Sequence, residues 1–183
     1  MKPVWGALCA CSLLSACTPA DFVGVDPVSG REIHARAEPN ARVNFSGTYT
    51  SPEGGTVFLW QDADRVQGSF TLHDCERAAH GWLTGKVRGN RAEVVWSELQ
   101  YETGVWKKYD SDGYLYLVSD STLGPAPRLL GEQTYVVVQP EGEGFDTVRI
   151  PQHTITWTAL RTGPVSLFPR APAAPVCKEG VPQ

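Results

Sequence analysis

The amino-acid sequence predicts an all-β fold, an antiparallel meander of about eight strands. Three observations predict it. Short apolar or alternating runs recur between residues 43 and 161, turn-forming residues separate them, and no window keeps a helical period of apolar side chains. Several turns are short enough to force antiparallel neighbours. Eight such strands suit either a closed up-and-down barrel or a two-sheet sandwich.

The expected strands follow one another in chain order. They lie near residues 43–49, 56–61, 64–72, 81–88, 91–98, 114–119, 134–139 and 154–161. Turn residues that favour hairpins separate several of them, at residues 52–55, 62–63, 89–90 and 110–113.

Alternation assigns the faces of two strands. Val66, Gly68, Phe70 and Leu72 point one way while the residues between them point to water, and Ala92, Val94 and Trp96 repeat the pattern. Other runs, such as residues 57–60, 114–117 and 135–138, are apolar on both faces. We therefore expect the chain's tails or a partner to cover their outer side.

The sequence around three glycines, Gly47, Gly68 and Gly85, resembles small avidin-like and lipocalin-like barrels, in which glycine and an aromatic residue recur strand after strand. The resemblance rests on the runs at residues 45–49, 65–70 and 83–87 and covers about the first half of the domain. It favours the barrel over the sandwich. It transfers no ligand-binding position of those families to this chain.

The first residues predict export. Lys2 precedes a short apolar run, which ends in a small-residue cleavage site and is too short to span a bilayer. Leu14, Ser15, Ala16 and Cys17 resemble the lipobox of bacterial lipoproteins. The resemblance implies cleavage before Cys17 and a diacylglycerol on its thiol, with Thr18 favouring the outer membrane. An ordinary secretory peptide is the alternative.

These features divide the chain into four parts. Residues 1–16 form the signal peptide, 17–42 a lipidated N-terminus and flexible tether, 43–161 the β-barrel-like domain, and 162–183 a Pro-rich tail. Within the tether, residues 22–25 form a candidate short strand.

The five cysteines reduce to one pair after processing. Cys9 and Cys11 leave with the leader and lipid modifies Cys17, so Cys75 and Cys177 remain. In an oxidising compartment such a pair is expected to form a disulfide. It would close a loop of about 100 residues. By lowering the entropy of the unfolded chain, such a loop stabilises the folded state by roughly 4 to 5 kcal/mol.

Gly68 and Gly85 lie in the middle of apolar strand faces, where glycine costs stability. In the functional interpretation, the two glycines leave room for a ligand cavity inside the barrel. The structural interpretation, sharp bending of a small barrel, is the commoner cause.

No catalytic or metal motif is recognisable. The titratable segment 73–77 with His80 lacks metal-ligand spacing. Asp110 and Asp112 resemble the start of a calcium loop, but a strand follows, so a hairpin turn is the better interpretation. Most tryptophans are expected in the core, with Trp106 exposed as a contact residue. No metal or cofactor is predicted.

Composition and charge narrow the function classes. The chain is 42% hydrophobic and 20% charged, and its formal net charge of −4 falls to −5 when Lys2 is removed. Without a basic patch, nucleic acid is not an expected partner, and lipid at Cys17 is the expected link to the membrane. The leading hypothesis is a non-enzymatic, lipid-anchored envelope module that binds or supports a partner. A small-ligand-binding barrel and an envelope hydrolase or metal-dependent enzyme are the alternatives.

Overall fold

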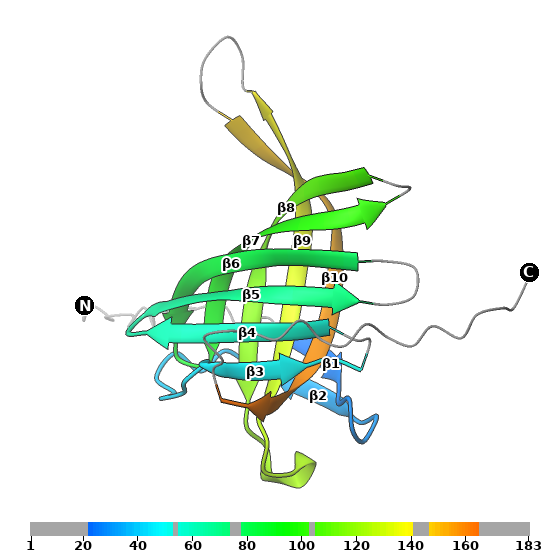
Figure 1. Ribbon diagram of the computed structural model, residues 1–183. Helices are drawn as coiled ribbons and strands as arrows, with labels where there is room; N and C mark the ends of the chain where they lie inside the picture. Colours follow the sequence, from blue (N-terminus) through cyan, green and yellow to red (C-terminus); the bar gives the residue numbers. More distant parts are fainter. Residues whose placement is uncertain (1–21, 53–54, 74–77, 103–104, 141–146, 165–183) are drawn as a thin grey trace, which may run out of the picture.

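The computed structural model describes residues 22–52, 55–73, 78–102, 105–140 and 147–164 (Figure 1). These residues contain ten strands and one short 3-10 helix. Eight antiparallel strands form a closed barrel in the order β10-β3-β4-β5-β6-β7-β8-β9. The all-β class, the meander of eight strands and the preference for a barrel are thereby confirmed.

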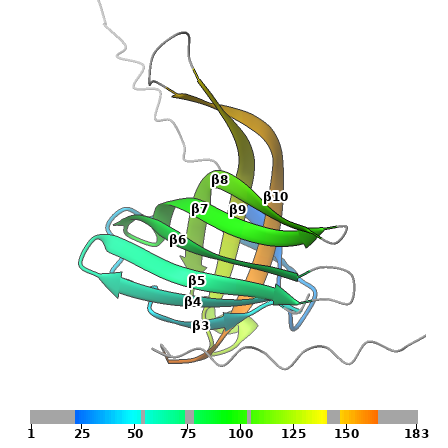
Figure 2. The ribbon, with the colours of Figure 1, turned by 45° about the horizontal axis from the view of Figure 1, so that its top comes forward.

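The elements are, in chain order, β1 (Phe22–Val25), β2 (Glu32–Ala35), β3 (Gly47–Thr50), β4 (Gly55–Asp62), β5 (Arg65–His73), β6 (Ala78–Arg88), β7 (Arg91–Glu102), β8 (Val105–Val118), η1 (Ser121–Leu123), β9 (Arg128–Pro140) and β10 (Thr147–Gly163). The ring closes between the end of β10 and the short strand β3, where Leu160 pairs with Thr50. β9 and β10 continue past the barrel as a two-stranded arm (Figure 2), because β8 pairs with β9 only as far as Val136.

The predicted turns at residues 62–63 and 89–90 are present. Ala63 and Gly89 both have positive φ, 51° and 62°, as tight hairpins require. Asn90 also holds the segment that precedes the barrel. Its side-chain oxygen accepts from the Glu38 backbone N–H at 2.7 Å, and its amide nitrogen donates to the Arg36 carbonyl at 2.9 Å.

The predicted turn at residues 110–113 is wrong, because this stretch lies inside β8. Ser111 points into the barrel and accepts a 2.8 Å hydrogen bond from Gln133. Asp112 lies on the outer face and receives two hydrogen bonds from Arg149, at 2.8 and 2.9 Å. Gly113 allows close contact with β9, since a Cβ there would lie 1.9 Å from the Glu132 carbonyl oxygen. The calcium-loop interpretation fails for the same reason.

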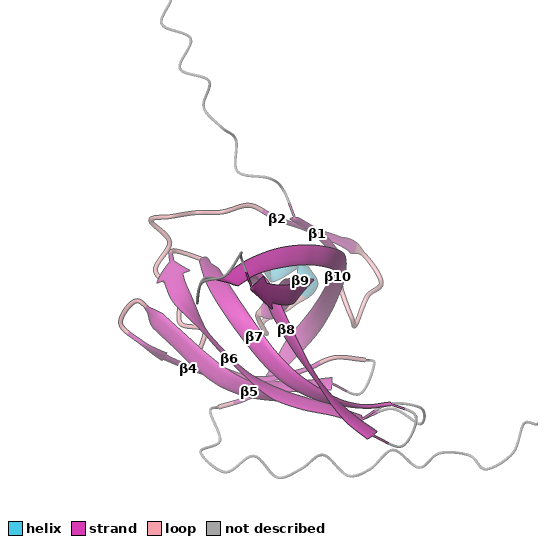
Figure 3. Ribbon diagram, turned by 90° about the horizontal axis from the view of Figure 1, so that it is seen from above, coloured by secondary structure: helices cyan, strands magenta, loops and turns pink. Residues whose placement is uncertain are grey.

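The expected flexible tether is shorter than residues 17–42, because β1 and β2 pair as a hairpin. The candidate strand at residues 22–25 is present as β1. The hairpin lies on the outside of the barrel beside β10 (Figure 3). There it packs its buried side chains on the outer face of β8 and β9, and Phe22 stacks on Tyr116 with ring centroids 5.6 Å apart. This contact explains why β8 is apolar on both faces.

The barrel core fills the end that holds the turns at residues 62–65 and 88–91. Its buried members come from all eight barrel strands and from Phe45 before β3; the largest are Trp96, Tyr49, Phe45, Leu59, Leu83, Leu115, Leu129 and Val66. Burial raises the pKa of Tyr49 to about 12 against the opposing effect of Arg161. The Tyr49 hydroxyl donates to the Phe45 carbonyl at 2.9 Å. The alternation predicted for β7 is confirmed, since Ala92, Val94 and Trp96 are buried. On β5, Val66 is buried and Phe70 packs partly buried against the core, whereas Gly68 to Leu72 are half-buried on both faces.

In the part of the chain that the structure describes, no helix has the length and apolar character needed to cross a membrane. Cys17, Cys75 and Cys177 lie outside the described residues, so the predicted lipid attachment and the predicted disulfide stay predictions.

Candidate functional site

A cavity of about 370 Å³ occupies the other end of the barrel, where β4 and β6 begin and β5 and β7 end. Residues of β4, β5, β6, β7, β9 and β10 line it, together with Ser51 after β3. They are Ser51, Gly55, Thr56, Val57, Phe70, Thr71, Leu72, Ala79, Trp96, Glu98, Gln100, Tyr101, Gln133, Tyr135, Ile155, Thr156 and Trp157.

The short strand β3 explains why the cavity is open. β3 ends at Thr50, so β10 before Leu160 has no paired neighbour on that side within the described chain. Ser51 and Thr56 border the cavity from one side of this gap, and Ile155 borders it from the other. The barrel is therefore filled at one end and hollow at the other.

Three aromatic rings form the inner end of the cavity. Trp96 is buried between Phe70 and Trp157 and meets both edge to face, with centroid distances of 5.6 and 5.8 Å. Trp157 lies across Gly131, its cross-strand partner on β9. A Cβ at Gly131 would lie 2.2 Å from the Trp157 ring, so the glycine makes room for the indole. These rings separate the cavity from the packed core.

One wall of the cavity is polar and centres on Glu98. This carboxylate is buried, with 4% of the residue exposed. It accepts a hydrogen bond from the Tyr135 hydroxyl at 2.7 Å, one from Gln133 Nε2 at 3.4 Å and a third from Gln100 Nε2. All three donors are neutral side chains, whereas a carboxylate can accept about four hydrogen bonds. The wall therefore offers a buried carboxyl group with acceptor capacity left.

Two polar atoms beside the cavity are unpaired within the described residues. The Trp96 indole N–H and the Thr71 hydroxyl are buried and find no hydrogen-bond partner there. Because a buried polar group without a partner is costly, the Trp96 N–H is available as a donor to a molecule that enters the cavity. Thr71 pairs with His80 across β5 and β6, so its hydroxyl lies on the outer face.

The structure corrects the predicted position of the cavity. Neither Gly68 nor Gly85 lines it. A Cβ at Gly68 would lie 2.1 Å from the Phe58 carbonyl oxygen, and one at Gly85 would lie 2.2 Å from the Glu93 carbonyl oxygen. Both glycines thus allow a neighbouring strand to approach closely, which agrees with the structural interpretation, bending of the barrel.

The other candidate residues are not gathered in the cavity. His80 lies on the outer face of β6, where its ring meets Trp106 at 5.0 Å. Residues 74–77 lie outside the described residues. In the described ranges, no group of three or more His, Cys, Asp or Glu side chains is placed to hold a metal ion. Trp106 is 52% exposed, which confirms its predicted exposure, whereas Trp60 and Trp82 are also exposed and correct the expectation of a core position.

Glu98 is a site residue that the sequence analysis missed although a signal was present. The β7 alternation that places Val94 and Trp96 inside also places position 98 inside. A carboxylate at an inward position is unusual unless it is paired. Gln133 and Tyr135 gave no comparable signal, because only closure of the barrel brings β9 beside β7 and β8.

Comparison with protein-family models, with curated proteins and with solved structures finds no significant match to this chain.

Proposed function

We propose that this chain is a non-enzymatic, small-ligand-binding barrel of the bacterial cell envelope, held on a membrane by lipid at Cys17. The observation that carries the binding proposal is the cavity of about 370 Å³ beside the buried carboxylate of Glu98. Binding cavities for small molecules measure roughly 300 to 1,000 Å³ and combine apolar walls with a few polar groups. The envelope address is supported by the lipobox-like residues 14–17.

The lining indicates the chemistry of the ligand. Phe70, Trp96 and Trp157 provide aromatic surface, which favours a flat apolar body. Glu98 favours a hydrogen-bond donor, and an amine above all, because a charge-assisted bond is stronger than a neutral one. Aromatic rings around a cation add to that preference. We propose a small aromatic or alicyclic amine as the ligand class.

Substitution of the carboxylate tests the proposal. Tryptamine serves as the cationic probe and 3-ethylindole as its uncharged counterpart, both titrated into the full mature protein by calorimetry. Glu98→Gln should weaken tryptamine binding about tenfold or more, because it removes a charged hydrogen bond worth about 1.5 to 3 kcal/mol. Binding of 3-ethylindole should change less than about threefold, because only the charge is lost.

Glu93→Gln is the matched control. Glu93 lies on the same strand but is exposed on the outer face, so its substitution should leave both titrations unchanged. Equal effects of the two substitutions on tryptamine would contradict the role of Glu98. Absence of binding by either probe, together with a native mass spectrum showing no co-purified molecule, would contradict the cavity as a ligand site.

A further inference from the structure

β10 has a free backbone edge at the cavity end of the barrel. One of its edges pairs with β9 over the whole stretch from Thr147 to Leu160. On the other edge, only Leu160, Arg161 and Gly163 have strand partners, and all of these partners lie in β3. Among the described residues, the earlier part of β10 is therefore an edge strand, and such an edge can pair with a further strand.

One hydrogen bond shows which backbone groups point to this free edge. The Arg161 N–H donates to the Pro127 carbonyl at 3.0 Å, on the β9 side. Backbone groups alternate in direction along a strand, and the β9–β10 register is continuous over this stretch. The N–H and C=O groups of Thr154, Thr156 and Thr158 therefore point away from β9. Thr154 and Thr156 are exposed, and these groups have no partner in the part of the chain that the structure describes.

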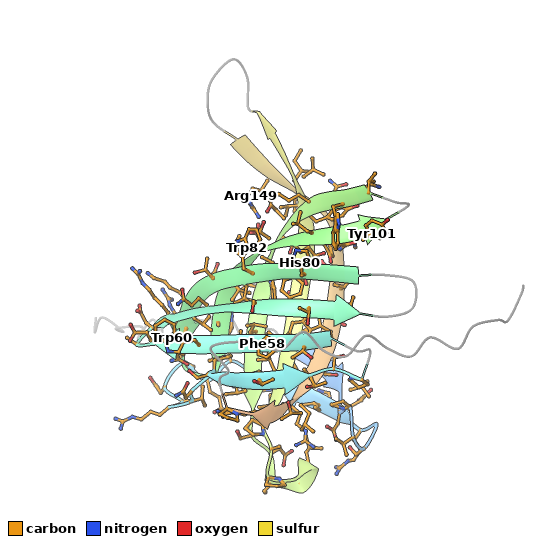
Figure 4. All side chains as sticks on the ribbon, in the orientation of Figure 1. Phe58, Trp60, His80, Trp82, Tyr101 and Arg149 are labelled. Carbon is orange, nitrogen blue, oxygen red and sulfur yellow. The ribbon has the colours of Figure 1, made fainter. Side chains whose placement is uncertain are left out.

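The free edge carries no charged side chain. Residues 150–160 contain no Asp, Glu, Lys or Arg. The nearest charged side chains on β10 are Arg149, at the base of the arm (Figure 4), and Arg161. Sheet edges that remain unpaired commonly carry a lysine, a proline or a bulge that prevents pairing. Pro151 and the register shift beside it protect only the outer part of β10, so residues 153–159 are open to a partner strand.

Both ends of the free edge are closed, which limits the length of a segment that fits. At one end, Leu160 is already paired with Thr50 of β3. At the other end, Pro151 has no N–H and the register shifts between Pro151 and His153. The stretch from residue 154 to residue 158 remains, which is about 17 Å of extended chain. A partner strand must therefore end or turn after about five residues.

The β10 strand of a second copy does not fit this length. Antiparallel pairing of two copies about Thr156 would bring Gln152 of one copy opposite Leu160 of the other. The place beside Leu160 is filled by Thr50. Because β10 continues through Gln152 into the arm, two barrels cannot pair in this way unless β3 is displaced. A short or terminal segment of another protein fits the edge better.

We propose that the free edge of β10 binds an extended, uncharged segment of a partner protein as an added strand, about five residues long and rich in β-branched side chains. The backbone groups of Thr154, Thr156 and Thr158 supply the hydrogen bonds. Their side chains lie on the outer face, since Trp157 packs toward the core, and threonine opposite threonine is a favourable cross-strand pair. The proposal does not rest on the ligand cavity, because it uses the main chain of β10 and not Glu98.

Binding of a peptide probe tests the added strand. The probe is fluorescein-Gly-Gly-Thr-Val-Thr-Val-Thr-amide, titrated with the full mature protein by fluorescence anisotropy. Thr156→Pro should weaken binding about tenfold or more, because it removes an N–H donor and places the proline ring in the path of the added strand. Proline is tolerated where the N–H faces away from the sheet, and a thermal melt verifies that the variant is folded. Thr156→Val is the matched control, which keeps the N–H and the β-branch and should change binding less than about twofold.

A second probe tests the hydrogen bonds on the unaltered protein. The same peptide N-methylated at its three central residues keeps the side chains but loses these N–H groups, so it should bind at least about tenfold more weakly. Equal binding of the two peptides would assign the contact to side chains and would overturn the proposal. Absence of saturable binding by the unmethylated probe would overturn it as well. Dimerisation of the protein that releases the probe, followed by sedimentation, would assign the edge to a second copy and contradict the proposal.

Discussion

Asp26 and Arg128 form an ion pair that lies inside the fold. The Arg128 Nε donates to Asp26 Oδ1 at 2.8 Å, and both side chains are almost wholly buried. The second carboxylate oxygen of Asp26 accepts hydrogen bonds from the Ser29 backbone N–H at 3.0 Å and from the Ser29 hydroxyl at 2.5 Å. The guanidinium also donates to the carbonyls of Leu123 and Ala126. One residue pair thus connects the hairpin, the segment around η1 and the start of β9.

This pair predicts acid sensitivity. The hydrogen bond from Arg128 is the largest effect and lowers the pKa of Asp26 from 3.8 to about 2. Because the pKa is lower in the folded than in the unfolded chain, its contribution is complete above about pH 4 and is lost as the pH falls to about 2. The shift corresponds to about 2 kcal/mol. Urea unfolding of Asp26→Asn and of the unaltered protein measures this contribution to the free energy of unfolding.

Asp26→Asn should destabilise the protein by about 3 to 5 kcal/mol at pH 6, because it leaves a buried arginine without its counter-ion. That difference should shrink by about 2 kcal/mol at pH 2, where the unaltered protein has itself lost the ionised carboxylate. Asp62→Asn, at an exposed turn position, should change stability by less than about 0.5 kcal/mol at both pH values. A difference for Asp26→Asn that stays constant from pH 6 to pH 2 would contradict the assignment.

Among the elements outside the barrel, the β1–β2 hairpin is the one whose removal should destabilise the protein most. Phe22 is buried against Tyr116, and a Phe→Ala truncation at such a site costs about 3 to 5 kcal/mol. We expect Phe22→Ala to destabilise the protein by about 3 kcal/mol and to increase hydrogen exchange in both hairpin strands. The adjacent Val23 is exposed, so Val23→Ala should cost less than about 0.5 kcal/mol. Similar losses for the two variants would mean that the hairpin is not fixed by this contact.

Strand alternation predicted the elements whose two faces differ in chemistry. β5 and β7 alternate cleanly, and their faces follow from the sequence alone. β8 does not, because Asp110, Ser111, Asp112 and Gly113 favour turns in isolation. Their place in a strand depends on partners distant in sequence, Gln133 for Ser111 and Arg149 for Asp112. Tertiary contacts therefore override local preference in this stretch.

The candidate site was less predictable than the fold. Glycines within apolar strand faces indicate either open space or close strand approach, and Gly68 and Gly85 prove to be of the second kind. The cavity instead depends on where β3 ends, which leaves the part of β10 before Leu160 without a strand partner on the β3 side among the described residues. The number of residues between β3 and β4 does not indicate that β3 ends so early. Glu98 could have been identified as a site residue from the β7 alternation alone, because the alternation places this charged side chain inside the barrel.

At the scale of the whole molecule, lipid attachment at Cys17 decides whether the barrel is anchored to a membrane or free. We expect the mature protein to fractionate with membranes and to incorporate labelled palmitate, because more than one acyl chain gives stable anchoring. Cys17→Ala should abolish labelling and leave the protein soluble or as an uncleaved precursor. Cys9→Ala, within the leader, is the control and should label normally. Palmitate on the Cys17→Ala protein would contradict the lipobox assignment.

The docked hairpin has a consequence for the reach and orientation of the molecule. With lipid on Cys17, only the stretch from Thr18 to Phe22 separates the bilayer from the fold, which limits the distance to about 17 Å. A free tether as far as Arg42 would allow about 90 Å. The hairpin covers β8 and β9, and in a ring of eight strands β5 lies opposite β9. An anchored barrel would therefore lie with its hairpin side toward the lipid and β5 turned away from it, and it would sample only molecules found close to the membrane surface.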